Sequence, residues 1–165
     1  MKEKMKVSIG MLVFLLVDQL TKFWAAAVLK DGGPISLIPG VLEFRYVENR
    51  GAAFGILQNR QWIFLLLGAA VLILLAVFVP KLPKEKHFLW LKLVLFFIAA
   101  GAIGNMIDRV WHGYVVDFIY FRLIDFPVFN VADIYVTCAA VAMVLLVMFY
   151  YSDEDFEKIF PKKVK

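Results

Sequence analysis

The chain has 165 residues, of which 62% are hydrophobic and 19% charged, and its formal net charge is +4. Soluble domains are about half apolar, so this composition, with a mean hydropathy of +0.79, excludes an ordinary soluble domain and indicates an integral membrane protein. Membrane spans of about 20 residues leave room for one domain, 1–165, and for no separate soluble domain. The basic charge does not indicate nucleic-acid binding, because the lysines gather in the tails and one short loop, where topology signals lie.

Four apolar segments are each about long enough to cross a bilayer. They are Val7–Leu29, Gln61–Val79, Phe88–Gly104 and Val131–Tyr151. Glycines, prolines and charged residues separate them, as is typical of turns and loops. We therefore predict an α-helical integral membrane protein with four transmembrane helices.

The first segment also fits a cleavable secretory signal, because lysines precede its apolar run and Ala25, Ala26 and Ala27 follow it. However, the apolar character resumes after Asp18 and Lys22 and continues to the end of the segment. This continuity favours a transmembrane helix that is retained.

Basic residues are distributed unequally between the two sides of a four-span arrangement. One side has ten lysines: Lys2, Lys4, Lys6, Lys81, Lys84, Lys86, Lys158, Lys162, Lys163 and Lys165. The other side has six basic residues: Lys30, Arg45, Arg50, Arg60, Arg109 and Arg122. Because cytoplasmic loops are enriched in Lys and Arg, we predict that both termini are cytoplasmic.

Sulfur and imidazole ligands for a metal are sparse. Cys138 is the only cysteine, which excludes an intramolecular disulfide and a two-cysteine metal site, and it is expected to be a small core residue. His87 and His112 fall in connections on opposite sides of the membrane, so they cannot form one metal site. No metal site is predicted.

The predicted topology gathers most of the unusual polar residues near the outer face. These are Asn49, Asn105, Asp108, Asp117, Asn130 and Asp133. A charged side chain at the bilayer centre costs roughly 2.5 to 3.5 kcal/mol, so carboxylates near membrane depth indicate a functional site. We expect a single site on that side.

Several of these polar residues, and others near them in the predicted helices, can also be explained by a purely structural role. Asp18 and Lys22 are four residues apart on one helix face and can form an ion pair. Asn130 suits the N-cap of the fourth helix, with Asp133 as its capping-box partner. Asn105 with Asp108 can form a polar helix end, and Gly101 with Gly104 can serve close helix packing.

Asp117 is harder to account for by structure alone, because it interrupts the apolar run 114–121, where a carboxylate is partly desolvated. If Asp117 and Asp133 converge at a semi-dry site, they share a proton, since neighbouring like charges cannot both ionise. Aspartic proteases use such a pair: one carboxylate activates water and the protonated one polarises the scissile carbonyl.

Five short motifs in order resemble those of a known family. They are Asp18–Lys22 (DQLTK), Asn49–Phe54 (NRGAAF), Gly104–Arg109 (GNMIDR), Val115–Phe118 (VVDF) and Phe129–Asp133 (FNVAD). Together, over nearly the whole chain, they resemble bacterial lipoprotein signal peptidase, also called signal peptidase II. The resemblance implies an intramembrane aspartic endopeptidase of the bacterial plasma (inner) membrane, active without a cofactor. Its partners would be membrane lipids and prolipoproteins, cut immediately before the diacylglyceryl-modified cysteine.

By motif position, the resemblance makes Asp117 and Asp133 the catalytic dyad, facing the extracytoplasmic side. Supporting or substrate-binding residues would be Asp18, Lys22, Asn49, Gly51, Asn105, Asp108, Arg109, Asn130 and Ala132. The resemblance also implies a small extracytoplasmic β-rich cradle around Val41–Glu48. The chain departs from the family at two places. It has Ala100–Gly101 where a glycine pair is common, and Ile134–Tyr135 where a small polar residue is common. Both departures affect the expected local packing of the helices.

Three other classes of protein fit the residues alone. A metal-dependent lipid headgroup transferase would use Asp108, Asp117 and Asp133 as Mg²⁺ ligands. A proton-coupled carrier would use carboxylates in the membrane, but it would need an oligomer, and no internal repeat is evident. A membrane scaffold without enzymatic activity would tolerate neutralisation of both dyad aspartates.

Overall fold

The computed structural model describes residues 2–51 and 58–160, without the side chains of residues 2–4. Within these ranges, four helical spans are long and apolar enough to cross a membrane, as predicted: Met5–Gly32, Gln61–Lys81, Lys86–His112 and Val131–Phe149. The Ala52–Phe54 part of the second motif and three of the topology lysines, Lys162, Lys163 and Lys165, lie outside the described residues. So do the side chains of Lys2 and Lys4.

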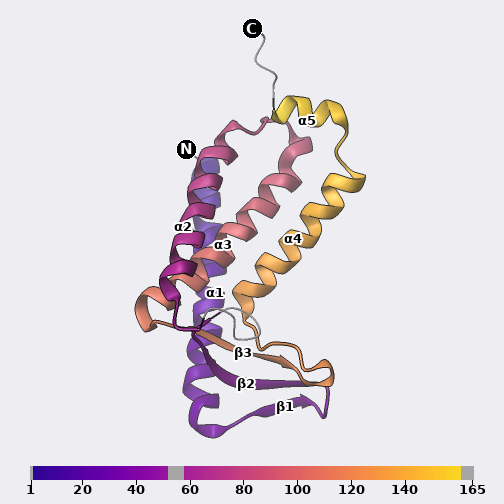
Figure 1. Cartoon of the computed structure of the whole chain (residues 1–165). Helices are drawn as coiled ribbons and strands as arrows, with labels where there is room; N and C mark the ends of the chain where they lie inside the picture. The colour runs from indigo at the N-terminus through magenta and orange to yellow at the C-terminus, as the bar shows by residue number, and fades with distance from the viewer. Residues whose placement is uncertain (1, 52–57, 161–165) are drawn as a thin grey trace.

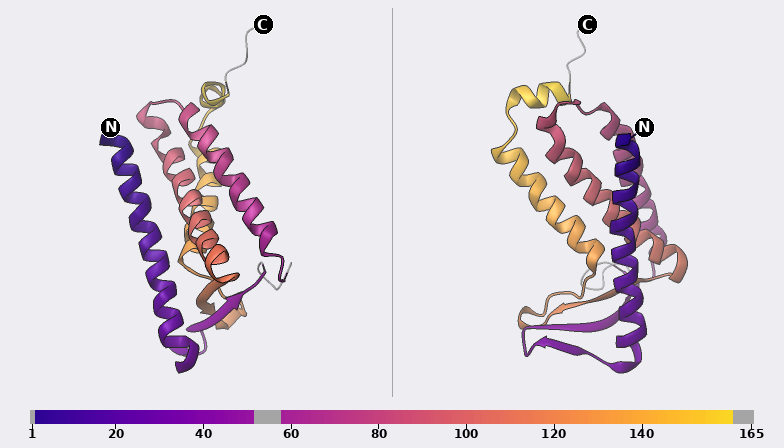
Figure 2. Two further views of the ribbon diagram at one scale, coloured as in Figure 1. Left: turned by 90° about the vertical axis from the view of Figure 1, so that its left-hand side faces the viewer. Right: turned by 180° about the vertical axis from the view of Figure 1, so that it is seen from behind.

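The long helices are α1 (Lys2–Gly32), α2 (Gln61–Phe78), α3 (Leu89–His112) and α4 (Val131–Phe149). Helix α3 lies centrally and contacts the other three (Figures 1 and 2). It extends well beyond the predicted end at Gly104, because its last turns carry polar residues that an apolar pattern does not register. The helix ends at Gly113, whose positive φ of 75° suits glycine and whose N–H donates to the Arg109 carbonyl at 3.1 Å.

A small antiparallel sheet lies at one end of the helices, away from the start of α1 (Figure 1). In the described part of the chain its order is β1 (Ile35–Ile38), β2 (Leu42–Asn49) and β3 (Val115–Phe121). Strand β2 covers the segment in which a sheet was expected. Strand β3 was predicted only as a connection, and it carries Asp117.

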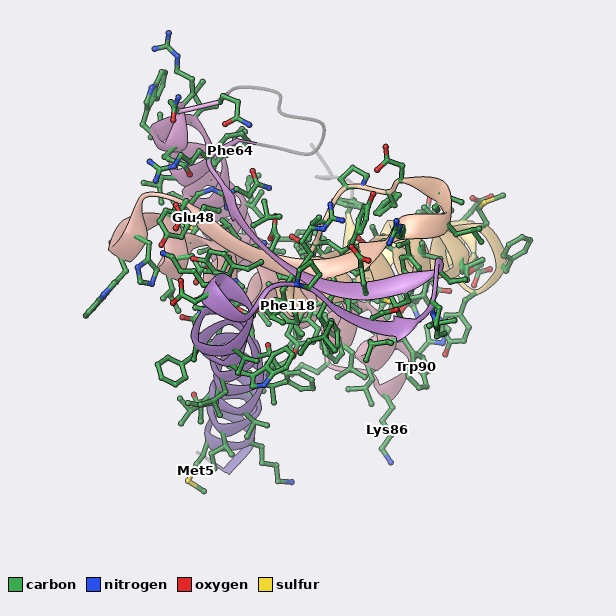
Figure 3. All side chains as sticks on the ribbon, turned by 90° about the horizontal axis from the view of Figure 1, so that it is seen from below. Met5, Glu48, Phe64, Lys86, Trp90 and Phe118 are labelled. Atoms are coloured by element: carbon green, nitrogen blue, oxygen red, sulfur yellow. The ribbon has the colours of Figure 1, made fainter. Side chains whose placement is uncertain are left out.

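Helix α1 supports the sheet. Its 31 residues span about 46 Å, which exceeds the roughly 30 Å of a bilayer's hydrocarbon core. The additional length reaches the sheet, where Ala25 and Leu29 pack against Val116 and Phe118 of β3. Figure 3, viewed from the sheet end, shows Phe118 where the strands cross α1. The sheet is therefore anchored to a membrane helix.

The opposite end of the bundle has its own apolar core, closed by the short helix α5 (Asp153–Ile159). Short 3₁₀ turns, η2 (Val79–Lys81) and η3 (Lys86–Phe88), connect α2 to α3 there, and a third, η4 (Arg122–Ile124), follows β3 at the sheet end. His87 Nε2 lies 3.0 Å from Asp155 Oδ2 at this end. The start of α1 lies at the same end of the molecule (Figure 1).

One prediction about the core is wrong. Cys138 is exposed on α4, not buried. A span surrounded by lipid has no need to turn its apolar side chains inward, so an apolar neighbourhood in the sequence does not distinguish core from lipid-facing positions.

Candidate active site

The register of the sheet places Asn49 beside Asp117. Asn49 pairs with Val115 across β2 and β3, and Asp117 follows Val115 by two residues, so both side chains lie on the same face. Asn49 Nδ2 donates to Asp117 Oδ2 at 2.8 Å. The backbone N–H of Gly51 donates to Asn49 Oδ1 at 2.9 Å, which turns the amide nitrogen toward the carboxylate.

Asn130 connects β3 to the start of α4. Just before it, Phe129 exchanges backbone hydrogen bonds with Ile119 of β3. Asn130 is fully buried, and its Nδ2 donates to Asp117 Oδ1 at 2.6 Å. Its Oδ1 accepts from the Asp133 backbone N–H at 3.0 Å, and its own N–H donates to Asp133 Oδ2 at 3.2 Å. The predicted capping box is confirmed, and the same residue links both carboxylates.

Asn105 on α3 holds the remaining oxygen of Asp133. Its Nδ2 donates to Asp133 Oδ1 at 2.7 Å, and its Oδ1 accepts from Lys22 Nζ at 2.9 Å. Because a lysine ammonium only donates, it fixes which end of the amide faces Asp133. Every carboxylate oxygen of Asp117 and Asp133 therefore accepts a hydrogen bond from an asparagine.

A buried ion cluster lies behind these asparagines. Lys22 Nζ is 2.9 Å from Asp18 Oδ2 and 3.2 Å from Asp108 Oδ2, which confirms the predicted pair on α1 and extends it to α3. Gln19, which was not selected from the sequence although it lies within the DQLTK motif, donates to Asp18 Oδ2 at 3.1 Å and Asp108 Oδ1 at 2.9 Å.

Asp18 and Asp108 also each hold a backbone segment beside Asp133 or Asp117. Asp18 Oδ1 accepts from the Ala132 N–H at 2.9 Å, which satisfies a free amide in the first turn of α4. Asp108 Oδ2 accepts from the Val116 N–H at 3.0 Å at the start of β3. Asp133 and Asp117 are the next residues along these two segments, so the ion cluster fixes the backbone beneath both.

Glycines allow this close packing. A Cβ at Gly104 would lie 2.5 Å from Asp18 Oδ2 and 3.2 Å from the Ala132 Cβ, and one at Gly101 would lie 2.5 Å from the Ala132 carbonyl oxygen. Side chains at either position would separate α3 from its neighbours. The packing role predicted for both glycines is confirmed, and Ala100 in place of a second glycine is accommodated as a buried residue.

The electrostatic setting of Asp117 favours its neutral form. Burial, with the charge of Asp133 as the second contribution, raises the pKa of Asp117 from 3.8 to about 7, although Asn49, Asn130 and Lys22 act in the opposite direction. Its side chain is only 2% exposed. A carboxyl with a pKa near neutrality can both hold and release a proton at working pH.

Asp117 and Asp133 both line a cavity of about 720 Å³. Asn49, Gly51 and Arg109 form its polar side, and apolar residues that follow β3 and begin α4 form the rest, including Phe121, Phe126 and Ile134. The Arg109 guanidinium lies 4.8 Å from the centre of the Phe64 ring, and its Nη1 donates to the Asn105 carbonyl at 3.4 Å. Phe64, on α2, gave no signal in the sequence.

The structure thus brings the predicted site residues together from five elements. Asp18, Lys22, Asn49, Gly51, Asn105, Asp108, Arg109, Asp117, Asn130, Ala132 and Asp133 form one connected network or line its cavity. Asp125 stays apart from it, exposed near Tyr120. In the described residues, no group of three or more His, Cys, Asp or Glu side chains is arranged to hold a metal ion.

Comparison with known proteins agrees with this arrangement. A sequence model described as "Signal peptidase (SPase) II" matches residues 10–149. The lipoprotein signal peptidase of Streptococcus thermophilus is 40% identical over 152 residues, which cover 92% of this chain and 96% of that protein. That of Streptococcus pyogenes is 36% identical over 157 residues, covering 94% and 99%.

Solved structures show the same relationship. One, titled "Bacterial membrane enzyme structure by the in meso method at 2.3 A resolution", superposes with a TM-score of 0.78 at 31% identity, covering 97% of this chain and 94% of that one. A second bacterial membrane enzyme, at 1.9 Å, gives a TM-score of 0.76 at 32% identity, covering 88% and 94%. The chain is a multi-pass membrane peptidase and belongs to the signal peptidase II family.

Proposed function

We propose that the protein is an intramembrane aspartic endopeptidase that removes signal peptides from prolipoproteins immediately before the diacylglyceryl-modified cysteine. Asp117 and Asp133 are the catalytic pair. The observation that supports this assignment best is that Asn49, Asn105 and Asn130 hold all four oxygens of the two carboxylates at the edge of one cavity. No metal and no cofactor are needed, since the pair supplies both a base and an acid.

In the proposed reaction the pair holds one proton between its two carboxyl groups. The ionised carboxylate takes a proton from water, and the water oxygen attacks the scissile carbonyl carbon. The protonated carboxyl donates to the carbonyl oxygen, which gives a tetrahedral diol. The carbon–nitrogen bond then breaks as the amine of the lipidated cysteine takes a proton from the carboxyl that activated the water. The other carboxylate takes back a proton from a diol hydroxyl, so the signal peptide leaves with a free carboxyl group and the pair again holds one proton.

The surrounding residues keep this pair in position. The asparagine amides fix the carboxylate rotamers, so little reorganisation is needed when the proton moves. Asp18, Lys22 and Asp108, with Gly51 and Ala132, position the asparagines and the backbone beneath the dyad. Arg109 faces the cavity with a half-buried guanidinium, which suits it to bind a carbonyl oxygen of the substrate.

We further propose that the enzyme lies in the bacterial plasma (inner) membrane with its site on the extracytoplasmic side and both termini in the cytoplasm. The lysine distribution supports this orientation. In a Cys138→Ala background, a single cysteine at Gly32 should react with an impermeant thiol reagent from outside, and one at Lys84 should not. Outside labelling at Lys84 would invert the proposed placement.

The direct test is incubation of the purified protein with one prolipoprotein in diacylglyceryl-modified and unmodified forms. Mass spectrometry should show a cut only before the modified cysteine. Cleavage elsewhere, or equal cleavage of both forms, would contradict the proposed specificity. Exchange of a lipid headgroup that depends on Mg²⁺, without peptide cleavage, would instead support the transferase alternative.

A further inference from the structure

A second cavity lies between α3 and α4, which run side by side through the bundle (Figure 1). Its volume is about 520 Å³, and its lining includes Trp90, Phe97, Ile134, Cys138, Ala142 and Leu145. Ala139 is buried at its base, whereas Trp90 and Leu145 are 55% and 52% exposed at its edges. The cavity is therefore a groove that opens sideways toward lipid, and we call it the α3–α4 groove.

The α3–α4 groove adjoins the catalytic cavity. Ile134 and Cys138 line both. Ile134 directly follows Asp133, so one end of the groove lies beside the dyad. From there to Leu145 the groove follows eleven steps along α4, or about 17 Å. This length is close to the depth of one leaflet, which is roughly half of the 30 Å hydrocarbon core.

The dimensions decide what can occupy the groove. A transmembrane helix about 10 Å wide and 17 Å long has a volume of about 1,300 Å³, far more than the groove offers. A single hydrocarbon chain is narrow enough to lie in it lengthwise. The lining is almost entirely apolar and has no charged side chain, and the hydroxyl of Tyr135, which also lines the groove, donates to the Phe14 carbonyl at 3.4 Å. The groove therefore suits an apolar ligand better than a charged or strongly polar one.

We propose that the α3–α4 groove binds one acyl chain of the substrate's diacylglyceryl group while the peptide bond is cut. This inference rests on the proposed function, because that function places the lipidated cysteine at the dyad and thus at the mouth of the groove. The groove then aligns the substrate: a chain that enters at Ile134 and runs toward Leu145 sets the distance between the lipidated cysteine and Asp133.

The expected energetic effect is moderate. An acyl chain moves into the groove from the surrounding lipid, not from water. It therefore gains packing contacts, but almost no additional apolar surface is removed from water. Filling the groove should therefore raise KM for long-chain substrates and leave kcat nearly unchanged. Ala142 lines the groove eight residues beyond Ile134, or about 12 Å along α4, and a phenylalanine there would block the far part of the groove. Ala140, two residues away, is exposed and does not line the groove, which makes Ala140→Phe a matched control.

The experiment compares prolipoproteins that carry two palmitoyl or two octanoyl chains, cleaved in detergent by the unmutated protein, Ala142→Phe and Ala140→Phe. The unmutated protein should prefer the palmitoyl substrate. Ala142→Phe should lose about tenfold in kcat/KM for that substrate, the size expected from an overpacked contact, and keep its rate on the octanoyl substrate. Ala140→Phe should retain the full preference.

Each other result contradicts the groove assignment. An unmutated enzyme with no preference for chain length would overturn it without any variant. Equal losses on both substrates in Ala142→Phe would show that the change acts on the site through packing. An equal loss in Ala140→Phe would show a general effect of bulk on α4. If the unmutated protein cleaves neither substrate, the proposed function itself fails, and the groove proposal fails with it.

Discussion

Replacement of Lys22 by methionine should strongly destabilise the protein. Lys22 is 3% exposed, and its ammonium lies 2.9 Å from Asp18 and 3.2 Å from Asp108, both of which are also buried. Breaking a buried ion pair by removing one partner costs about 3 to 5 kcal/mol, because the other charge stays buried without compensation. Here one cation serves two carboxylates, so we expect a loss of free energy of unfolding near the upper end, about 5 kcal/mol.

The measurement is unfolding in detergent, by heat and by denaturant, with Lys30→Met as the control. Lys30 forms an ion pair of similar length, 3.1 Å to Glu48, but its side chain is 51% exposed. Exposed pairs contribute little, so Lys30→Met should unfold close to the unmutated protein. The triple variant Lys22→Met, Asp18→Asn, Asp108→Asn should recover much of the stability, since removing all the buried charges avoids an unpaired one. Equal stability of Lys22→Met and Lys30→Met would refute the account of the buried cluster.

The dyad, the helix packing and the absence of a metal requirement can each be tested separately. Because the pKa of Asp117 is raised from 3.8 to about 7, the folded protein keeps a proton that the unfolded chain releases, so stability should fall as pH rises from about 4 through about 7. The full effect corresponds to about 4 kcal/mol, and denaturant titrations of Asp117→Asn should lack this slope. Gly104→Ala should destabilise by about 1 to 3 kcal/mol, whereas Gly10→Ala should be tolerated, because its Cβ would lie an ordinary 3.6 Å from Phe96. Cleavage should survive exhaustive chelation, and activity that returns only with added Mg²⁺ would contradict the metal-free mechanism.

The membrane helices were predictable from the sequence, because uninterrupted apolar segments of this length are typical of bilayer spans. The convergence of polar residues on one side was also predictable, since the order of the helices determines which ends meet. The ion pair of Asp18 with Lys22 and the capping box at Asn130 were predictable for a different reason: both depend on local spacing within one helix or its first turn.

Long-range pairing was not predictable from the residues. The hydrogen bond from Asn49 to Asp117 depends on the register of β2 against β3, which no local pattern specifies. The short helix α5 was missed, although Ser152 and Asp155 have the spacing of a capping box that could have indicated it. The exposed position of Cys138 depends on which face of α4 meets lipid, and apolar composition alone does not distinguish the two faces.

The most direct test of the central claim is prolipoprotein cleavage by Asp117→Asn and Asp133→Asn, with Asp125→Asn as the control. Asparagine keeps the size of aspartate and much of its hydrogen bonding but cannot exchange a proton with water. Asp125 lies outside the site, is exposed and has a positive φ of 49°, which asparagine tolerates.

Both dyad variants should remain folded, because asparagine fills the same space and leaves only one group in the pair that can ionise, so no like-charge repulsion can arise. Their cleavage rates should fall at least about a hundredfold, in line with the contribution of general acid–base catalysis. Asp125→Asn should cleave at the normal rate. Near-normal cleavage by either dyad variant, in protein shown to be folded, would contradict the assignment of Asp117 and Asp133 as the catalytic pair.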